Sequence, residues 1–226
     1  MSSLPAYLGE YPTDDALQAA FAASGARAGA RGTVAGRSVE DRPIARFDLG
    51  RPDGPVVLLT ALIHGVELIG GLALLGLVDA LARRPDLLGA ARFVVLPVVN
   101  PDALAANTRR LLAGRPAGQR GNARGVDLNR NFPAQTARAP LHPFSGSRYR
   151  LSPHYMGPRA LSEPESQAVA AVAREVRPAL SLAFHSFGEM LLFPYAFTRA
   201  RHPRAAAYER LGAARNAALP ARPFVV

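Results

Sequence analysis

The stretch VVLLTALIHGVE, residues 56–67, decides the fold of this chain. Its first eight residues, Val56 to Ile63, form a nearly continuous apolar run, as a strand covered on both faces requires. The residues that follow, 68–81, are apolar on almost every side, which predicts a largely buried helix. Because a buried strand passes directly into a buried helix, we expect an α/β fold.

Other segments carry the patterns of further helices and strands. Thr13-Asp14-Asp15 predicts the start of a helix that ends at Gly25, because acids in a first turn suit the helix dipole. A capping box at residues 162–165 predicts another helix, with Ser162 as N-cap and Glu165 at its third position. Strands are predicted at residues 33–35, 43–49, 93–99, 179–185 and 190–193, and a last helix at 203–219.

The order of these elements predicts an α/β fold with a mixed, largely parallel central sheet and helices on both faces. The chain has 226 residues and is 49% hydrophobic. This is enough for one sizeable core, so a single domain over residues 1–226 is expected. Residues 100–161 are rich in Gly, Pro and Arg and are expected to form one long irregular segment.

Composition limits the chemistry and the compartment. The chain has no cysteine. Disulfides and thiolate metal sites are therefore excluded, and a zinc ion would have to bind His, Asp or Glu. Residues 1–11 lack the basic and apolar regions of a secretory signal, and no apolar stretch reaches the length of a membrane span. A cytoplasmic protein without a membrane partner is expected.

The charge is strongly positive, at +10, and all 27 basic residues are arginine. One interpretation is a partner with phosphates or carboxylates. The other is a compositional bias toward Arg on solvated faces. The arginines are dispersed and few aromatic residues lie between them, which favours the second interpretation and argues against a nucleic-acid partner.

Two strand ends carry possible metal ligands. His64 and Glu67 lie three residues apart at a strand-to-helix junction, and His185 ends the strand predicted at 179–185. In open α/β sheets, ligands bind at the carboxyl ends of the strands. Two His and one Glu form a ligand set for catalytic zinc that leaves a position for water. Taken alone, a His after a strand is more often a hydrogen-bonded structural residue.

A third segment, Asp127-Leu128-Asn129-Arg130-Asn131-Phe132, carries groups that bind carboxylates. Arg130 offers a planar fork that matches a carboxylate, and Asn129 adds an amide donor beside it. A polar loop with an Asx turn is the alternative interpretation of these residues.

Five motifs occur in the order HGVE (64–67), NPD (100–102), GVDLNRNFP (125–133), LSEPE (161–165) and FHS (184–186). In this order they resemble the M14 zinc carboxypeptidase family, and the resemblance covers about residues 33–200. The segment GRSVEDRPI at 36–44 also looks like the one that precedes the metal motif in bacterial members. The resemblance implies a carboxypeptidase fold, a zinc-dependent peptidase activity and a peptide substrate with a free C-terminal carboxylate.

The resemblance also implies roles for particular residues. His64, Glu67 and His185 would bind one Zn²⁺ ion, and Asn129 and Arg130 would hold the terminal carboxylate of the substrate. The family uses an upstream arginine to stabilise the oxyanion, and Arg120 fits best. The reserve candidates for this arginine are Arg115, then Arg109 and Arg110.

The sequence departs from the family pattern after His185. The family's general base, a Glu, and its mobile Tyr lie well downstream of the third ligand. The candidates here are Glu189, Glu209, Tyr195 and Tyr208, and none sits at the family's spacing. The chain is therefore expected to be C-terminally incomplete or shortened, and its own turnover to be poor.

Two further points bear on the site. Val66 replaces an Arg that touches substrate in the digestive members of the family, which favours small or murein-derived peptides. The other histidines, which lie beside proline or in the long irregular segment, are expected to be surface or turn residues: His142, His154 and His202.

The favoured function is a zinc metallocarboxypeptidase that removes a C-terminal residue from a peptide. The alternatives are a related zinc amidohydrolase acting on murein peptides or N-acyl amino acids, and a non-catalytic module that binds zinc and carboxylates.

Overall fold

A computed structural model describes residues 12–136, 146–186, 188–195, 200–221 and 224–225 of the chain. Its helices are α1 (Asp14–Arg27), α2 (Leu68–Ala82), α3 (Pro85–Ala90), α4 (Pro101–Leu112), α5 (Pro133–Thr136), α6 (Pro164–Val176) and α7 (Ala205–Ala218), with a 3₁₀ turn, η2, at Leu128–Arg130. Its strands are β1 (Arg31–Arg37), β2 (Pro43–Gly50), β3 (Val56–Ala61), β4 (Arg92–Leu96) and β5 (Leu180–Phe184).

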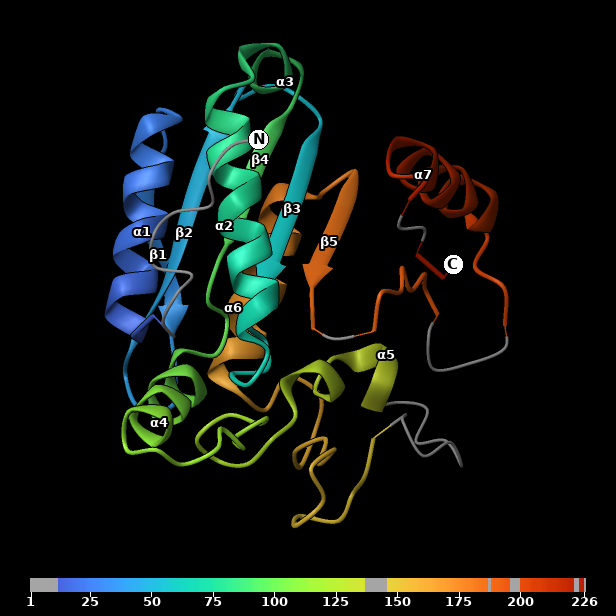
Figure 1. The fold of residues 1–226 in the computed structure, drawn as a ribbon. Coiled ribbons are helices and arrows are strands. Elements are labelled where there is room, and N and C mark those ends of the chain that lie inside the picture. The colour runs from blue at the N-terminus through green and yellow to red at the C-terminus, as the bar shows by residue number, and fades with distance from the viewer. Residues whose placement is uncertain (1–11, 137–145, 187, 196–199, 222–223, 226) are drawn as a thin grey trace.

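The five strands form one mixed sheet in the order β1-β2-β4-β3-β5 (Figure 1). The strands β4, β3 and β5 are parallel neighbours, and β2 and β1 continue the sheet in antiparallel pairings. The predicted α/β class and mixed sheet are confirmed. Because β3, β4 and β5 run in the same direction, their carboxyl ends meet at one edge of the sheet.

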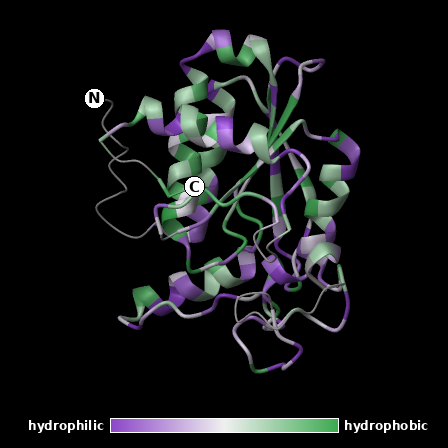
Figure 2. Cartoon of the chain, turned by 90° about the vertical axis from the view of Figure 1, so that its right-hand side faces the viewer, coloured by the Kyte–Doolittle hydropathy of each residue, from purple (hydrophilic) through white to green (hydrophobic). Residues whose placement is uncertain are grey.

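Each face of the sheet is covered by helices. Helices α1 and α2 lie together on one face, and α6 lies on the other (Figure 1). Alternate residues of β3 point to opposite faces, so Leu59 packs in the cluster with Leu75 of α2, and Leu58 packs in the cluster with Val172 of α6. Hydrophobic residues follow the strands, and hydrophilic residues are frequent in the loops (Figure 2).

The prediction of an irregular segment from 100 to 161 was wrong at its start. Helix α4 begins at Pro101, and Asn100 caps it by accepting a hydrogen bond from the Ala103 amide at 3.1 Å. Its buried residues include Ala103, which lies against Gly65, and Leu104, which packs in the cluster with Ala61 of β3. An Asn-Pro pair at a helix start is a capping signal, so this helix could have been found from the sequence. The short helices α3 and α5 were also missed.

The capping-box prediction at Ser162 was wrong as well, although the helix exists. Glu163 is the N-cap residue of α6, and its side chain makes no capping hydrogen bond to the helix. The Ser162 hydroxyl instead donates to the Glu163 carboxylate at 2.7 Å, and Glu165 accepts from the amide of Val39 at 3.0 Å. The Ser162 hydroxyl and the Glu165 carboxylate, which the sequence pattern placed in a capping box, are therefore engaged in other hydrogen bonds.

The C-terminal part also differs from expectation in one place. The predicted strand 190–193 is not formed, since Met190 makes only an isolated bridge with Val225. The last helix, α7, is found within the predicted range. Among the described residues, no helix has both the length and the apolar character needed to cross a membrane.

Candidate metal centre

The first two candidate ligands lie in the turn between β3 and α2. His64 is buried, and Glu67 occupies the N-cap position of α2, with its amide donating to the His64 carbonyl at 3.1 Å. Gly65 lies between them, directly against α4. A Cβ atom on Gly65 would lie only 2.5 Å from the Ala103 carbonyl carbon, so this position requires glycine. The turn is thus held closely against the start of α4.

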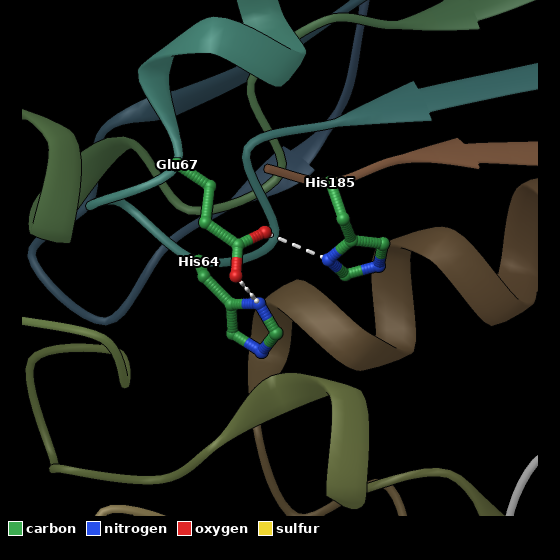
Figure 3. A group of neighbouring side chains, drawn as sticks. All are labelled: His64, Glu67 and His185. Carbon is green, nitrogen blue, oxygen red and sulfur yellow. Dashed lines mark hydrogen bonds and ion pairs between the residues drawn. The ribbon is translucent and has the colours of Figure 1, made fainter. Parts of the chain in front are cut away.

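The third candidate ligand, His185, follows β5, the parallel neighbour of β3. Figure 3 shows both histidine rings directed at the Glu67 carboxylate. The Nδ1 atom of His64 lies 2.9 Å from Glu67 Oε1, and the Nδ1 atom of His185 lies 2.7 Å from Oε2. The three side chains offer ligand atoms that all lie within 4.8 Å of one another. The structure thus brings the three predicted ligands together.

The donor set fits zinc. Two imidazole nitrogens and a carboxylate match the ligands of catalytic zinc sites. The imidazole ring of His64 is held in place from the side away from Glu67, because its Nε2 atom lies 2.9 Å from Oδ1 of the buried Asp127. A carboxylate on the outer nitrogen of a ligand histidine sets the tautomer and leaves the inner nitrogen free for a metal. Asp127 belongs to the GVDLNRNFP motif, although no role was predicted for it.

Arg120 bridges the ligand Glu67 and the supporting Asp127. Its Nη1 lies 3.3 Å from Glu67 Oε1, and its Nε donates to Asp127 Oδ2 at 3.0 Å. The alternatives Arg109, Arg110 and Arg115 are exposed, and Arg110 donates to the Pro116 carbonyl instead. Of the four arginines considered from the sequence, Arg120 therefore lies at the centre.

The charges of the centre follow from burial opposed by hydrogen bonds. Burial disfavours the charged carboxylate of Glu67, but the hydrogen bonds from His185 and His64 outweigh it and lower its pKa to about 2. Burial likewise disfavours the charged form of His64, but its hydrogen bonds with Asp127 and Glu67 outweigh burial and raise its pKa. The pKa of Asp127 is lowered because His64 and Arg120 outweigh its burial. Glu67 and Asp127 are thus carboxylates at neutral pH.

Arg130 and Asn129 lie beside this centre on η2. The Nε atom of Arg130 is buried and has no hydrogen-bond partner among the described residues, and its Nη1 donates to the Asn129 carbonyl at 3.2 Å. Burial lowers the pKa of Arg130, although the nearby Asp127 opposes this. A partly desolvated guanidinium with an unused donor is a group that a ligand carboxylate would complete.

His154 lies in a turn, as expected, and its side chain also approaches the supporting Asp127. Its side chain is 30% exposed, and its Nδ1 lies 3.4 Å from Asp127 Oδ2. The segment around it is drawn in because the Asp127 amide donates to the Tyr155 carbonyl at 2.8 Å. His202 does lie in the turn before α7, where it accepts from the Arg204 amide at 3.0 Å. His142 lies outside the described residues.

A buried polar network supports the loop that carries Arg130. The Asn131 amide nitrogen donates to the carbonyls of Met156 and Arg159 at 2.8 and 3.0 Å. Its oxygen accepts from the Ser166 hydroxyl at 2.6 Å and from the Glu163 amide at 3.3 Å. Asn131 therefore ties η2, the 156–159 loop and the start of α6 together.

The two glutamates that follow His185 do not join the centre. Glu209 forms an exposed ion pair with Arg201, as its helix position predicted. Glu189 lies beyond the ligand group, and its carbonyl accepts from the Val225 amide at 3.1 Å. The described residues therefore place no further carboxylate, besides Glu67, in the ligand group.

Known proteins are similar to this chain over most of its length. Residues 30–223 match the model of the zinc carboxypeptidase family. The chain is 32% identical to human carboxypeptidase A6 over 200 residues, which are 79% of this chain and 44% of the relative. It is 30% identical to rat mast cell carboxypeptidase A over 177 residues, or 72% of this chain and 42% of the relative. The chain thus spans less than half the length of these curated relatives.

Solved structures show the same fold. Carboxypeptidase A from Helicoverpa armigera matches with a TM-score of 0.67 and 28% identity, over 86% of this chain and 49% of that chain. Bovine thrombin-activatable fibrinolysis inhibitor, solved with a tick carboxypeptidase inhibitor, matches with a TM-score of 0.75 and 22% identity, over 89% of this chain and 69% of that chain. By sequence and by fold, this chain belongs to the zinc carboxypeptidase family.

Proposed function

We propose that the whole protein is a metallocarboxypeptidase that hydrolyses the C-terminal peptide bond of peptides at a single zinc ion held by His64, Glu67 and His185. The observation that carries this proposal is the convergence of two imidazole Nδ1 atoms and one carboxylate within 4.8 Å at the carboxyl ends of β3 and β5. A zinc ion bound there would supply Lewis-acid chemistry, since it would polarise a substrate carbonyl and lower the pKa of a water molecule.

The remaining residues of the centre have roles that follow from their contacts. Asp127 holds the outer nitrogen of His64 and so fixes the ring for metal binding. Arg120 lies against Glu67 and places a cation where a substrate carbonyl would develop negative charge. Arg130, with its unused buried donor, and Asn129 hold the substrate's terminal carboxylate. Fixing that end directs the last peptide bond, rather than an internal one, to the metal.

Efficient turnover also needs a proton acceptor, which typically contributes about 10²–10⁴-fold. The Glu209 carboxylate is engaged with Arg201 at the surface, so it does not supply this group. We propose that turnover by the described residues alone is poor, and that a carboxylate outside the ligand group serves as the base.

The test compares three substrates with the zinc-loaded protein: a blocked dipeptide with a free carboxylate, its C-terminal amide, and an N-acyl amino acid. The proposal expects cleavage of the free dipeptide, and binding of that peptide even where turnover is low. Arg130→Ala should weaken binding of the dipeptide with a free carboxylate and leave binding of its C-terminal amide unchanged. Arg51→Ala, an exposed residue at the opposite end of the sheet, is the matched control.

The outcomes separate the alternatives. Preferred cleavage of the N-acyl amino acid would assign the protein to the related amidohydrolases. Zinc-dependent binding of the free dipeptide with no cleavage, in the whole protein as well as in this chain, would assign it to a non-catalytic module. If Arg130→Ala reduced binding of the free-acid and the amidated dipeptide equally, the role given to Arg130 would be contradicted.

A further inference from the structure

The positive charge of the protein is concentrated in one segment. Residues 103–162 contain ten arginines and one acidic residue, Asp127. The other 166 residues contain 17 arginines and 16 acidic residues, so they are almost neutral. Arginines are dispersed along the whole sequence, but the acids that balance them elsewhere are missing here. We call residues 103–162 the basic segment.

The basic segment forms part of the candidate metal centre. It begins in α4, which follows β4 after residues 97–100 and lies below the sheet in Figure 1. It supplies Arg120, Asp127 and Arg130 to the centre itself. Its later part returns to the same place, because the Asp127 amide bonds to Tyr155 and the Leu161 amide donates to the Asn131 carbonyl at 2.7 Å.

Most of the arginines in this segment are available to a ligand. Six of them are exposed and have no carboxylate partner among the described residues: Arg109, Arg110, Arg115, Arg148, Arg150 and Arg159. In the rest of the chain, seven arginines form ion pairs with carboxylates among the described residues, as Arg46 does with Asp48 and Glu175. The described part of the basic segment therefore carries a net positive field at the edge of the sheet where a substrate must arrive.

We infer that the centre acts on acidic peptides, whose side chains carry negative charge in addition to the terminal carboxylate. This inference rests on the proposed function and names its substrate class. Arg130 is assigned to the terminal carboxylate of the substrate. A peptide with no other negative charge would leave the six further exposed arginines without a partner. The summed charge of a surface that carries one sign attracts oppositely charged ligands and raises their association rate, by about 10–10³-fold in favourable cases.

A peptide fits this surface better than a nucleic acid. Binding of single strands combines basic residues with aromatic platforms for the bases. In the described part of the basic segment, Tyr149 is the only exposed large aromatic side chain. The unused donor of Arg130 is also buried, where it suits the end of a chain rather than a continuous backbone.

The test measures binding to the zinc-loaded protein by titration calorimetry. The ligands are matched peptides that carry either glutamate or glutamine before the same C-terminal residue, each as the free acid and as the C-terminal amide. Two double variants are compared: Arg148→Gln with Arg150→Gln in the basic segment, and Arg51→Gln with Arg83→Gln at the opposite end of the sheet. All four arginines are exposed, so each pair removes the same charge.

At low salt the glutamate peptide should bind about 10-fold tighter than the glutamine peptide, and the difference should largely disappear near 1 M salt, where charges are screened within about 3 Å. The Arg148/Arg150 variant should lose several-fold of the preference, and the Arg51/Arg83 variant should keep it. Equal affinity for the two peptides at low salt, or equal losses in the two variants, would overturn the inference.

Two further outcomes keep the proposals apart. If a single-stranded oligonucleotide displaces the glutamate peptide at lower concentration than the peptide itself, the basic segment serves a nucleic acid, and the inference is overturned. If free acids and amides bind equally while glutamate is still preferred, the carboxypeptidase proposal fails and the preference for acidic ligands stands.

Discussion

Gly65→Ala is the substitution that most sharply tests how the centre is built. Gly65 separates His64 from Glu67 and packs on the first turn of α4. The added Cβ would lie 2.5 Å from the Ala103 Cβ and carbonyl carbon, and 2.7 Å from the Leu104 nitrogen. Carbon atoms in contact prefer separations of about 3.5–4.0 Å, so the turn must move by about 1 Å. Two of these three atoms are backbone, so a side-chain rotation cannot relieve the clash.

The magnitude follows from that displacement. Overpacking a dense interior typically costs about 1–3 kcal/mol, and we expect a loss near the upper end in the free energy of unfolding. A metal site tolerates deviations of only about 0.2 Å in ligand distance, so a shift of the turn should also weaken zinc binding by about 10-fold or more. Gly76→Ala is the control: it lies in α2 with open space around it and should stabilise the protein by about 0.5–1 kcal/mol.

Both quantities can be measured on the same preparations. Urea unfolding followed by circular dichroism gives the free energy of unfolding, and competition with a chromogenic chelator gives the zinc affinity. If Gly65→Ala unfolded like the wild type and bound zinc equally well, the turn would not be held against α4 as described. A loss of the same size in Gly76→Ala would show a general effect of alanine rather than a local clash.

Three other substitutions test separate parts of the account. Asp127→Asn should weaken zinc binding by about 10–100-fold in a chelator competition, because His64 loses its carboxylate partner; an unchanged affinity would refute the supporting role. Asn131→Ala should lower the free energy of unfolding by about 3 kcal/mol in urea titrations, since it leaves buried groups without hydrogen bonds; a loss under about 0.5 kcal/mol, typical of a surface site, would contradict this. The pKa of Asp48 is lowered because its hydrogen bonds from Arg46 and Arg92 outweigh burial, so its stabilising effect is present above the ordinary aspartate pKa of about 3.9 and is lost as the pH falls. Asp48→Asn should therefore cost about 1 kcal/mol at pH 7 and progressively less below pH 4; a cost independent of pH would exclude the ion pair as its cause.

The main layout of the fold could be read from the sequence because the decisive patterns are local. The apolar run at 56–63 and the helix after it were predicted from composition and periodicity alone. The meeting of His64 with His185 follows from one general rule, that parallel strands place their carboxyl ends at the same edge. The role of Arg120 was predicted only from the family resemblance, because this residue lies in an irregular loop, seven positions before Asp127.

The features that were missed depend on contacts between distant segments. His154 comes close to Asp127 because backbone hydrogen bonds join residues 127 and 155, and no local pattern records that pairing. Ser162 loses its capping role because Glu165 is bonded to Val39, 126 residues away. Helix α4 is the exception, since Asn100-Pro101 did signal its start and the abundance of Gly and Pro further along the segment obscured it.

Zinc K-edge X-ray absorption on the protein with one equivalent of zinc would show which side chains hold the ion. We expect tight binding of one ion, with two imidazole nitrogens at about 2.0–2.1 Å and oxygen ligands at a similar distance. His185→Ala should remove one imidazole from the spectrum. A spectrum with oxygen ligands alone, or one that His185→Ala leaves unchanged, would contradict the assignment of His64, Glu67 and His185 as the metal centre.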